Sequence, residues 1–171
     1  IYGKDYTYRE DMTPQDMARV VMENYDPAFA GMVRAGDLVV GGYNFGTGSS
    51  REQAVTALQA AGIRMLVAGT YSQTYQRNAI NNGFLCLESP ELVEALKAAF
   101  AGREGKTLLV ETGLKVDFAN SKIIWGGKEF GVSPTGRPVQ EVILAGGVEN
   151  LVRAALKSCV KPSAMMHNDI H

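Results

Sequence analysis

Residues 41–53 read Gly41-Gly42-Tyr43-Asn44-Phe45-Gly46-Thr47-Gly48-Ser49-Ser50-Arg51-Glu52-Gln53. The apolar run Asp37-Leu38-Val39-Val40 precedes this stretch and the alanine-rich residues 54–61 follow it, so we predict a strand, a glycine-rich loop and the start of a helix. A helix start presents free amide hydrogens and the positive end of the helix dipole. The hydroxyls of Ser49 and Ser50 and the guanidinium of Arg51 lie at this predicted helix start. The stretch therefore predicts a binding site for an anion.

The kind of anion follows partly from what the loop lacks. A nucleotide-binding P-loop needs Lys and then Ser or Thr after its last glycine, and a dinucleotide fingerprint needs a third glycine three residues after the second. Here Ser49 follows Gly48, and Arg51 occupies the position of the third glycine. The planar fork of an arginine matches a carboxylate, so we expect a carboxylate ligand. A structural alternative stays open, in which Ser49 or Ser50 only caps the helix and Glu52 lies in its first turn.

Residues 45–54 resemble the serine–arginine signature of the swivelling domain of the aconitase superfamily. The similarity continues through residues 75–83 and 141–147, and it covers roughly residues 1–157. The resemblance implies the swivelling β/β/α fold. It also implies a hydro-lyase activity, in which a hydroxyl moves between adjacent carbons of a carboxylic acid by dehydration and rehydration.

The resemblance assigns roles to three residues of the loop. Ser49 would be the catalytic base that removes a proton from carbon, acting as an alkoxide. Since an unperturbed serine is a weak base, it would need help from the helix N-terminus and from Arg51. Ser50 and Arg51 would bind a substrate carboxylate.

A second set of candidates lies near the N-terminus, before a helix expected to begin near Thr13. In the small-subunit branch of the superfamily this position is the loop that touches the variable arm of the substrate. The resemblance therefore implies that Arg9 holds a distal carboxylate and that Tyr6 and Tyr8 shape the pocket. From composition alone, residues 6–9 also fit a solvated loop.

The resemblance places the cofactor, a [4Fe-4S] cluster, on other cluster-bearing domains, in the same polypeptide or in a large subunit. The only cysteines are Cys86 and Cys159, and a cluster takes three or four thiolates. We interpret both as buried, inert thiols. His167 and His171 belong to a polar tail and are not expected to bind metal. We thus expect no cofactor-binding residue and no metal site in this chain.

Within the superfamily, residues 6–9 and 41–48 look most like a fungal, mitochondrial branch that serves lysine biosynthesis and acts on tricarboxylic acids. A branch that serves leucine biosynthesis is one alternative; its substrate carries an isopropyl group where Arg9 would lie, at a desolvation cost. A non-catalytic carboxylate-binding or assembly module is the other.

Length, composition and net charge limit the class of protein that this chain can be. With 171 residues, 46% of them hydrophobic, and a net charge of -1, the chain fits one soluble domain, residues 1–160, with a flexible tail at 161–171. Near neutrality gives no reason to expect nucleic acid or an acidic membrane surface. No apolar run approaches the roughly 20 residues that span a bilayer. The chain starts at Ile1 without an initiating Met or signal peptide, and we interpret it as a fragment or a trimmed product.

The periodicity predicts a mixed α/β domain, with a parallel βαβ part and antiparallel hairpins. Strands are expected over residues 38–40, 63–68 and 84–87, the second of them buried on both faces, with helices over 50–61, 72–80 and 90–100. A period of two then predicts strands over residues 107–111, 115–118, 122–125 and 129–132, with turns at 120–121 and 126–127. One last helix is expected over residues 139–157, with Gly146 and Gly147 inside it.

Overall fold

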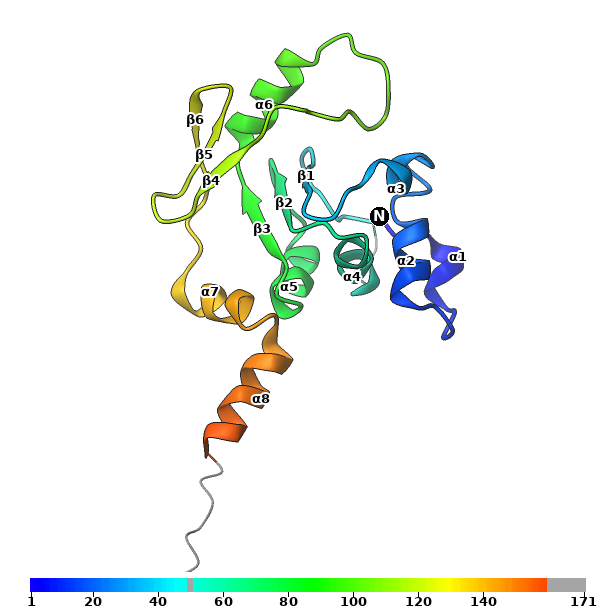
Figure 1. Cartoon of the computed structure of the whole chain (residues 1–171), viewed down its shortest axis with the longest axis vertical. Helices are drawn as coiled ribbons and strands as arrows, with labels where there is room; N and C mark the ends of the chain where they lie inside the picture. The colour runs from blue at the N-terminus through cyan, green and yellow to red at the C-terminus, as the bar shows by residue number, and fades with distance from the viewer. Residues whose placement is uncertain (49–50, 160–171) are drawn as a thin grey trace, which may run out of the picture.

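The structure, a computed structural model, describes residues 1–48 and 51–159. Two three-stranded sheets form its core, and helices cover the outer face of the first sheet (Figure 1). The first sheet is parallel, has the order β1-β2-β3, and consists of Leu38–Val40, Met65–Ala68 and Leu85–Glu88. The crossover helices between these strands are α4 (Gln53–Ala60) and α5 (Gln73–Asn81). The predicted βαβ part is confirmed.

The middle strand β2 is buried on both faces, as its unbroken apolar run predicts. Because side chains alternate along a strand, Leu66 and Ala68 join the core under α4 and α5. Met65 and Val67 point the other way, into a second core that includes Leu92 and the antiparallel sheet. The layers are therefore helices, parallel sheet and antiparallel sheet, which confirms the β/β/α expectation.

The antiparallel sheet has the order β4-β5-β6 and comprises Lys115–Asp117, Lys122–Trp125 and Lys128–Gly131. Gly126 and Gly127 both have positive φ, 56° and 77°, as the tight hairpin turn between β5 and β6 requires. Ile123 and Phe130 are buried between this sheet and α6 (Pro90–Ala99). Trp125 packs on Phe100 at the rim, with ring centroids 6.2 Å apart. Both predicted hairpins are confirmed.

The expected strand over residues 107–111 is wrong. In the described chain these residues are irregular and belong to the long loop that projects between α6 and β4 (Figure 1). Leu109 is 56% exposed, and the loop is tied to the N-terminal segment by a hydrogen bond from the Tyr25 hydroxyl to the Lys106 carbonyl, 2.8 Å. Apolar, β-prone residues form a strand only where a neighbouring strand edge can pair with them, and none is described beside this loop.

The single helix expected over residues 139–157 is also wrong. Two helices occupy this region, α7 (Arg137–Leu144) and α8 (Val148–Cys159). Gly146 and Gly147 separate them, with φ of 76° and 116°, outside the range of a right-handed helix. The break lets Gly147 lie against the end of α5, where a Cβ would come within 2.7 Å of the Asn81 carbonyl oxygen. Helix α8 then projects from the body (Figure 1).

Three short helices, α1 (Lys4–Thr7), α2 (Pro14–Val20) and α3 (Phe29–Met32), make up the N-terminal part. The predicted start of α2 is confirmed, because Thr13 and Asp16 form a reciprocal capping box. Val21, at the end of α2, is fully buried in the core that also contains α4. In the part of the chain that the structure describes, every helix falls short of the length and apolarity needed to cross a membrane.

Candidate functional site

The glycine-rich loop leaves β1 at its carboxyl end and runs beside the segment that leaves β2. Phe45 donates its amide hydrogen to the Thr70 carbonyl (2.9 Å) and accepts one from the Ser72 amide (2.9 Å), so Phe45 and Tyr71 form a short parallel bridge. The Ser72 hydroxyl caps α5 and also donates to the Gly46 carbonyl, 2.9 Å. The loop therefore lies where open parallel sheets bind ligands, outside the carboxyl ends of the strands.

An aromatic cluster supports this loop from below. The ring of Phe45 meets Tyr71 and Tyr75 edge-on, with centroids 6.2 and 5.4 Å apart. The buried Tyr71 hydroxyl lies within hydrogen-bond distance of two strand carbonyls, on Leu66 (2.9 Å) and Leu87 (3.1 Å). Burial raises the pKa of Tyr71 and Tyr75, which keeps both neutral. The floor of the site is thus rigid and uncharged.

Helix α4 starts later than the sequence predicts. Its first residue is Gln53 and Glu52 occupies the N-cap position, where no side-chain cap is found among the described residues. The N-cap therefore falls on neither of the two serines named by the structural alternative. Arg51 lies directly before this position in the chain.

Arg51 contacts Tyr8, which brings together two candidates that are 43 residues apart in the chain. A terminal nitrogen of Arg51 donates a hydrogen bond to the Tyr8 hydroxyl at 3.0 Å. The central guanidinium carbon also lies 4.7 Å from the centroid of the Tyr8 ring. The fold therefore brings the N-terminal segment into contact with the residue that follows the glycine-rich loop.

Ser49 and Ser50, the expected base and its neighbour, lie outside the described residues. The structure describes Gly48 and Arg51 on either side of them. Their roles stay predictions.

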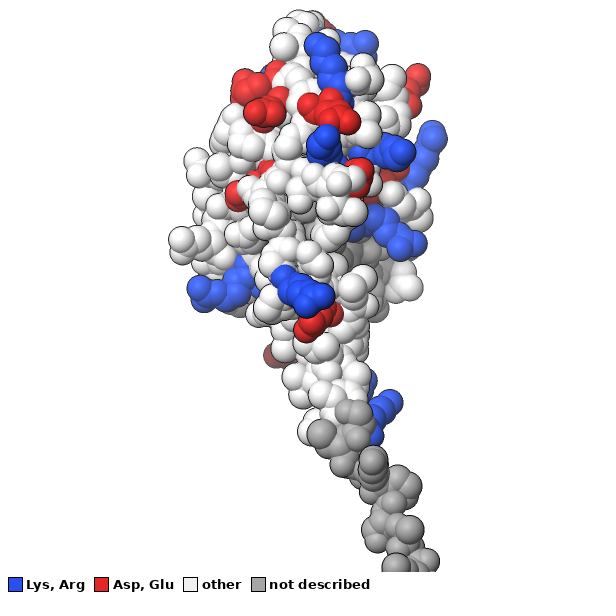
Figure 2. Space-filling model, turned by 90° about the vertical axis from the view of Figure 1, so that its left-hand side faces the viewer, with Lys and Arg blue, Asp and Glu red and all other residues white. Residues whose placement is uncertain are grey.

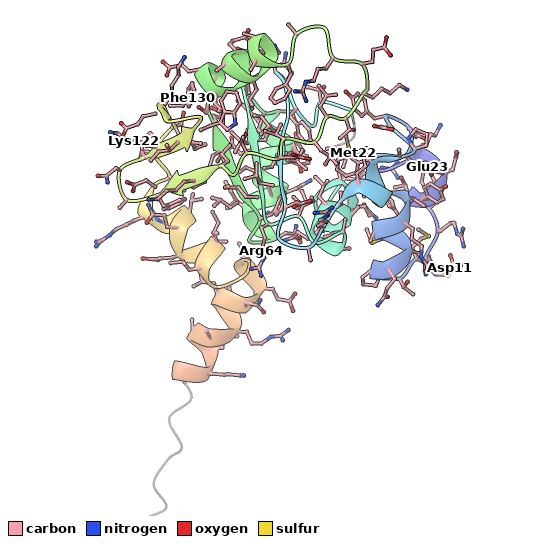
Figure 3. All side chains as sticks on the ribbon, turned by 45° about the horizontal axis from the view of Figure 1, so that its top comes forward. Asp11, Met22, Glu23, Arg64, Lys122 and Phe130 are labelled. Carbon is pink, nitrogen blue, oxygen red and sulfur yellow. The ribbon has the colours of Figure 1, made fainter. Side chains whose placement is uncertain are left out.

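The other two N-terminal candidates already have partners. Residues 4–7 form the helical turn α1 instead of a loop, and the Tyr6 hydroxyl donates to the Glu23 carboxylate at 2.7 Å. Arg9 pairs with Asp11 through two hydrogen bonds, of 3.1 and 2.8 Å. Each member of this pair favours the charged form of the other, which raises the pKa of Arg9 and lowers that of Asp11. Figure 3 places Asp11 and Glu23 on the N-terminal side of the molecule, away from Lys122 and Phe130.

Sequence reasoning missed one residue of the loop, Tyr43. The Lys97 ammonium lies 4.7 Å above the centroid of its ring, and its hydroxyl bonds to Glu94, which raises the pKa of Tyr43. Both partners belong to α6, so this contact ties the loop to the layer on the other side of the sheet. In the local sequence, the only indication of this contact is that Tyr43 is an aromatic residue between two glycine-containing turns.

The donor set of the described residues does not fit a metal cluster. No group of three or more His, Cys, Asp or Glu side chains comes together within residues 1–48 and 51–157. Cys86 lies next to Tyr71, and burial raises the pKa of its thiol to about 12, so it is not a thiolate at neutral pH. This agrees with the expected inert thiol at Cys86. Cys159, His167 and His171 lie outside the described side chains.

Comparison with known proteins gives the class of the chain. The aconitase C-terminal domain family matches residues 3–92, which include the glycine-rich loop, Arg51 and Tyr8. The chain belongs to this family.

Curated relatives narrow the similarity further. The chain is similar to the mitochondrial homoaconitases of Candida glabrata, 46% identical over 91% of this chain, and of Mycosarcoma maydis, 42% identical over 90% of it. It spans about a quarter of the length of these relatives, 24% and 25%. Among solved structures, the 3-isopropylmalate dehydratase of Methanocaldococcus jannaschii has a TM-score of 0.74 and 27% identity, and the match covers 93% of this chain and 88% of that one.

Proposed function

We propose that this chain is the swivelling domain of a homoaconitase, a hydro-lyase that interconverts homocitrate, cis-homoaconitate and homoisocitrate. The observation that carries the proposal is the position of Arg51, which lies at the start of α4, within the family match, and in contact with Tyr8. The 46% identity to a mitochondrial homoaconitase supports this branch of the family, mitochondrial localisation and a place in lysine biosynthesis.

In this proposal Arg51 and Ser50 bind a substrate carboxylate, and Ser49 removes the proton from the neighbouring carbon. The guanidinium and the start of α4 both favour the negatively charged form of Ser49. Arg9 binds the distal carboxylate of the tricarboxylic acid, with Tyr6 and Tyr8 at the wall of the pocket. Since Arg9 is paired with Asp11, the substrate carboxylate has to compete with that side chain.

We assign the [4Fe-4S] cluster to partner domains, in the same polypeptide or in a large subunit, as the family similarity implies. The relatives are about four times as long as the matched region, which supports such partners. Basic and acidic side chains are interspersed on the face that Figure 2 shows, which gives no support to a nucleic-acid partner.

The test is hydration of cis-homoaconitate, cis-aconitate and isopropylmaleate by the chain mixed with anaerobically reconstituted cluster-bearing domains. Turnover of cis-homoaconitate is expected. Replacing Ser49 with Ala should lower kcat by about 10²-fold or more with little change in KM, as expected for a general base. Ser133→Ala, at an exposed serine that follows β6, is the control. Full activity of the Ser49 variant would instead favour a non-catalytic carboxylate-binding or assembly module.

One observation favours a second function. One solved structure that resembles this chain is a 3-isopropylmalate dehydratase, and the match covers 93% of this chain and 88% of that one. Isopropylmaleate carries an apolar group where Arg9 would meet the substrate, which costs desolvation of the guanidinium. If the mixture prefers isopropylmaleate in the same assay, the chain would instead be assigned the activity of a 3-isopropylmalate dehydratase. If Arg9→Leu leaves cis-homoaconitate turnover unchanged, Arg9 does not bind the substrate.

A further inference from the structure

The contact between Tyr8 and Arg51 has an unusual form for a surface tyrosine. Tyr8 is 73% exposed, yet its hydroxyl accepts a hydrogen bond from Arg51 and its ring lies 4.7 Å from the guanidinium carbon. The exposed Tyr8 side chain thus contacts Arg51 through both its hydroxyl and its ring. An arginine held in this way has fewer conformations to lose when a ligand binds.

The contact leaves donors of Arg51 available. A guanidinium has five N–H donors in a fixed plane, and the structure shows one terminal nitrogen donating to the Tyr8 hydroxyl. The remaining edge can still form the two parallel hydrogen bonds that a carboxylate accepts. Tyr8 therefore orients the guanidinium without using the N–H donors that a carboxylate needs.

The turn that carries Tyr8 is itself fixed. Tyr6 is bonded to Glu23 at 2.7 Å, and the Thr7 hydroxyl donates to the Gly3 carbonyl at 3.1 Å. The amide of Met22 also donates to the Ile1 carbonyl, 2.7 Å, which holds the chain end against the end of α2. These bonds give Tyr8 a defined place beside the start of α4.

We propose that Tyr8 is a positioning residue for Arg51, which it holds in the orientation that binds the carboxylate common to the substrates of this family. The inference rests on the proposed function and separates the roles of Tyr8 and Arg9. Because Tyr8 acts through Arg51, its effect is the same whatever arm the substrate carries. An effect of Arg9 depends on the distal carboxylate.

A double-mutant cycle tests this in the reconstituted enzyme. Tyr8→Leu removes ring and hydroxyl, and Tyr8→Phe removes only the hydroxyl. We expect Tyr8→Leu to raise KM about 10-fold and Tyr8→Phe about threefold, with cis-homoaconitate and isopropylmaleate affected alike. In an Arg51→Lys background, Tyr8→Leu should change KM less than about twofold. Tyr25→Leu, at another exposed tyrosine with a hydrogen bond, and Arg64→Lys, at an exposed arginine just before β2, are the matched controls.

Equal losses in both Arg51 backgrounds would overturn the proposal, because Tyr8 would then contact the substrate by itself. An unchanged KM in Tyr8→Leu would overturn it as well. A second readout needs no turnover: ¹⁵N NMR of the chain alone should show a slowly exchanging Arg51 side-chain N–H signal that Tyr8→Leu abolishes and Tyr25→Leu preserves. If Tyr8→Leu leaves that signal unchanged, the proposal fails. If the wild-type mixture hydrates no substrate, the proposed function fails, and the NMR result still decides whether Tyr8 positions Arg51.

Discussion

Gly46 lies directly against the ring of Tyr75. A Cβ built on Gly46 would come within 2.5 Å of the Cβ of Tyr75, and Gly46 has a φ of 81°, in the left-handed region. The loop that carries Arg51 therefore depends on a glycine packed on the buried aromatic cluster. Steric space and backbone conformation both exclude a larger residue at this position.

Gly46→Ala should lower the free energy of unfolding by about 2–4 kcal/mol, the sum of left-handed strain and overpacking. Urea unfolding measures this change. Gly42→Ala is the matched control, since a Cβ at Gly42 meets nothing within 4 Å and its φ is not positive. A loss below about 1 kcal/mol for Gly46→Ala would mean that the loop can lift off the cluster.

The contact of Gly147 with the end of α5 leads to a second prediction. Gly147→Ala places a Cβ 2.7 Å from a backbone oxygen of Asn81 and adds left-handed strain, so we expect a loss of about 3 kcal/mol or more. Gly102 also has positive φ, 81°, but is open to space, and Gly102→Ala should cost only about 1 kcal/mol. Thermal unfolding of both variants separates the cost of the steric contact, which only Gly147→Ala introduces, from the cost of left-handed backbone strain, which both variants share. Equal losses would argue against the packing of α7 and α8 on α5.

Removing the partner of Arg9 should strengthen substrate binding. Asp11→Asn breaks an exposed ion pair and frees the guanidinium, so KM for cis-homoaconitate should fall about two- to fivefold with kcat unchanged. Glu149→Gln, which removes a similar exposed carboxylate paired with Arg153 on α8, controls for the change in net charge. An unchanged KM in Asp11→Asn would show that Arg9 does not meet the distal carboxylate.

Stability should fall at alkaline pH. Burial raises the pKa of Cys86 from 9.0 to about 12, so between these values the unfolded state loses a proton that the folded state keeps. The contribution of this thiol to the free energy of unfolding is then constant below about pH 8 and decreases as pH rises toward 12, by at most about 4 kcal/mol. Urea unfolding at pH 7, 9 and 10 measures the slope.

Cys86→Val is the control for this slope. Its decrease between pH 9 and 10 should be shallower than that of the wild type, because the contribution of the thiol is gone and only that of other groups with raised pKa values, such as Tyr71, Tyr75 and Tyr43, is left. The thiol should also resist alkylation at pH 8 in the folded chain. Rapid alkylation there would contradict the raised pKa of this partly buried thiol.

Local sequence was sufficient for most elements. Thr13 and Asp16 start α2 through a capping box, and Gly126 with Gly127 turns β5 into β6. The apolar run of β2 indicates burial on both faces. These predictions succeed because each depends on residues only a few positions apart.

The two failures and the missed contacts depend on distant residues. Residues 107–111 have the composition of a strand, but pairing needs an edge elsewhere in the chain. The break between α7 and α8 places Gly147 against Asn81, which helical periodicity does not reveal. Tyr43 contacts Lys97 only because α6 lies beside the loop.

The sequence by itself therefore determined the family, the parallel core and the types of residue at the site, since the serine–arginine stretch and its flanking strand and helix are contiguous. Only the tertiary structure decided which candidates meet. It joins Arg51 to Tyr8 and pairs Arg9 with Asp11 and Tyr6 with Glu23. The physical reason is that a side chain's partner is set by how the helices and strands pack. No local periodicity encodes the proximity of two residues 43 positions apart.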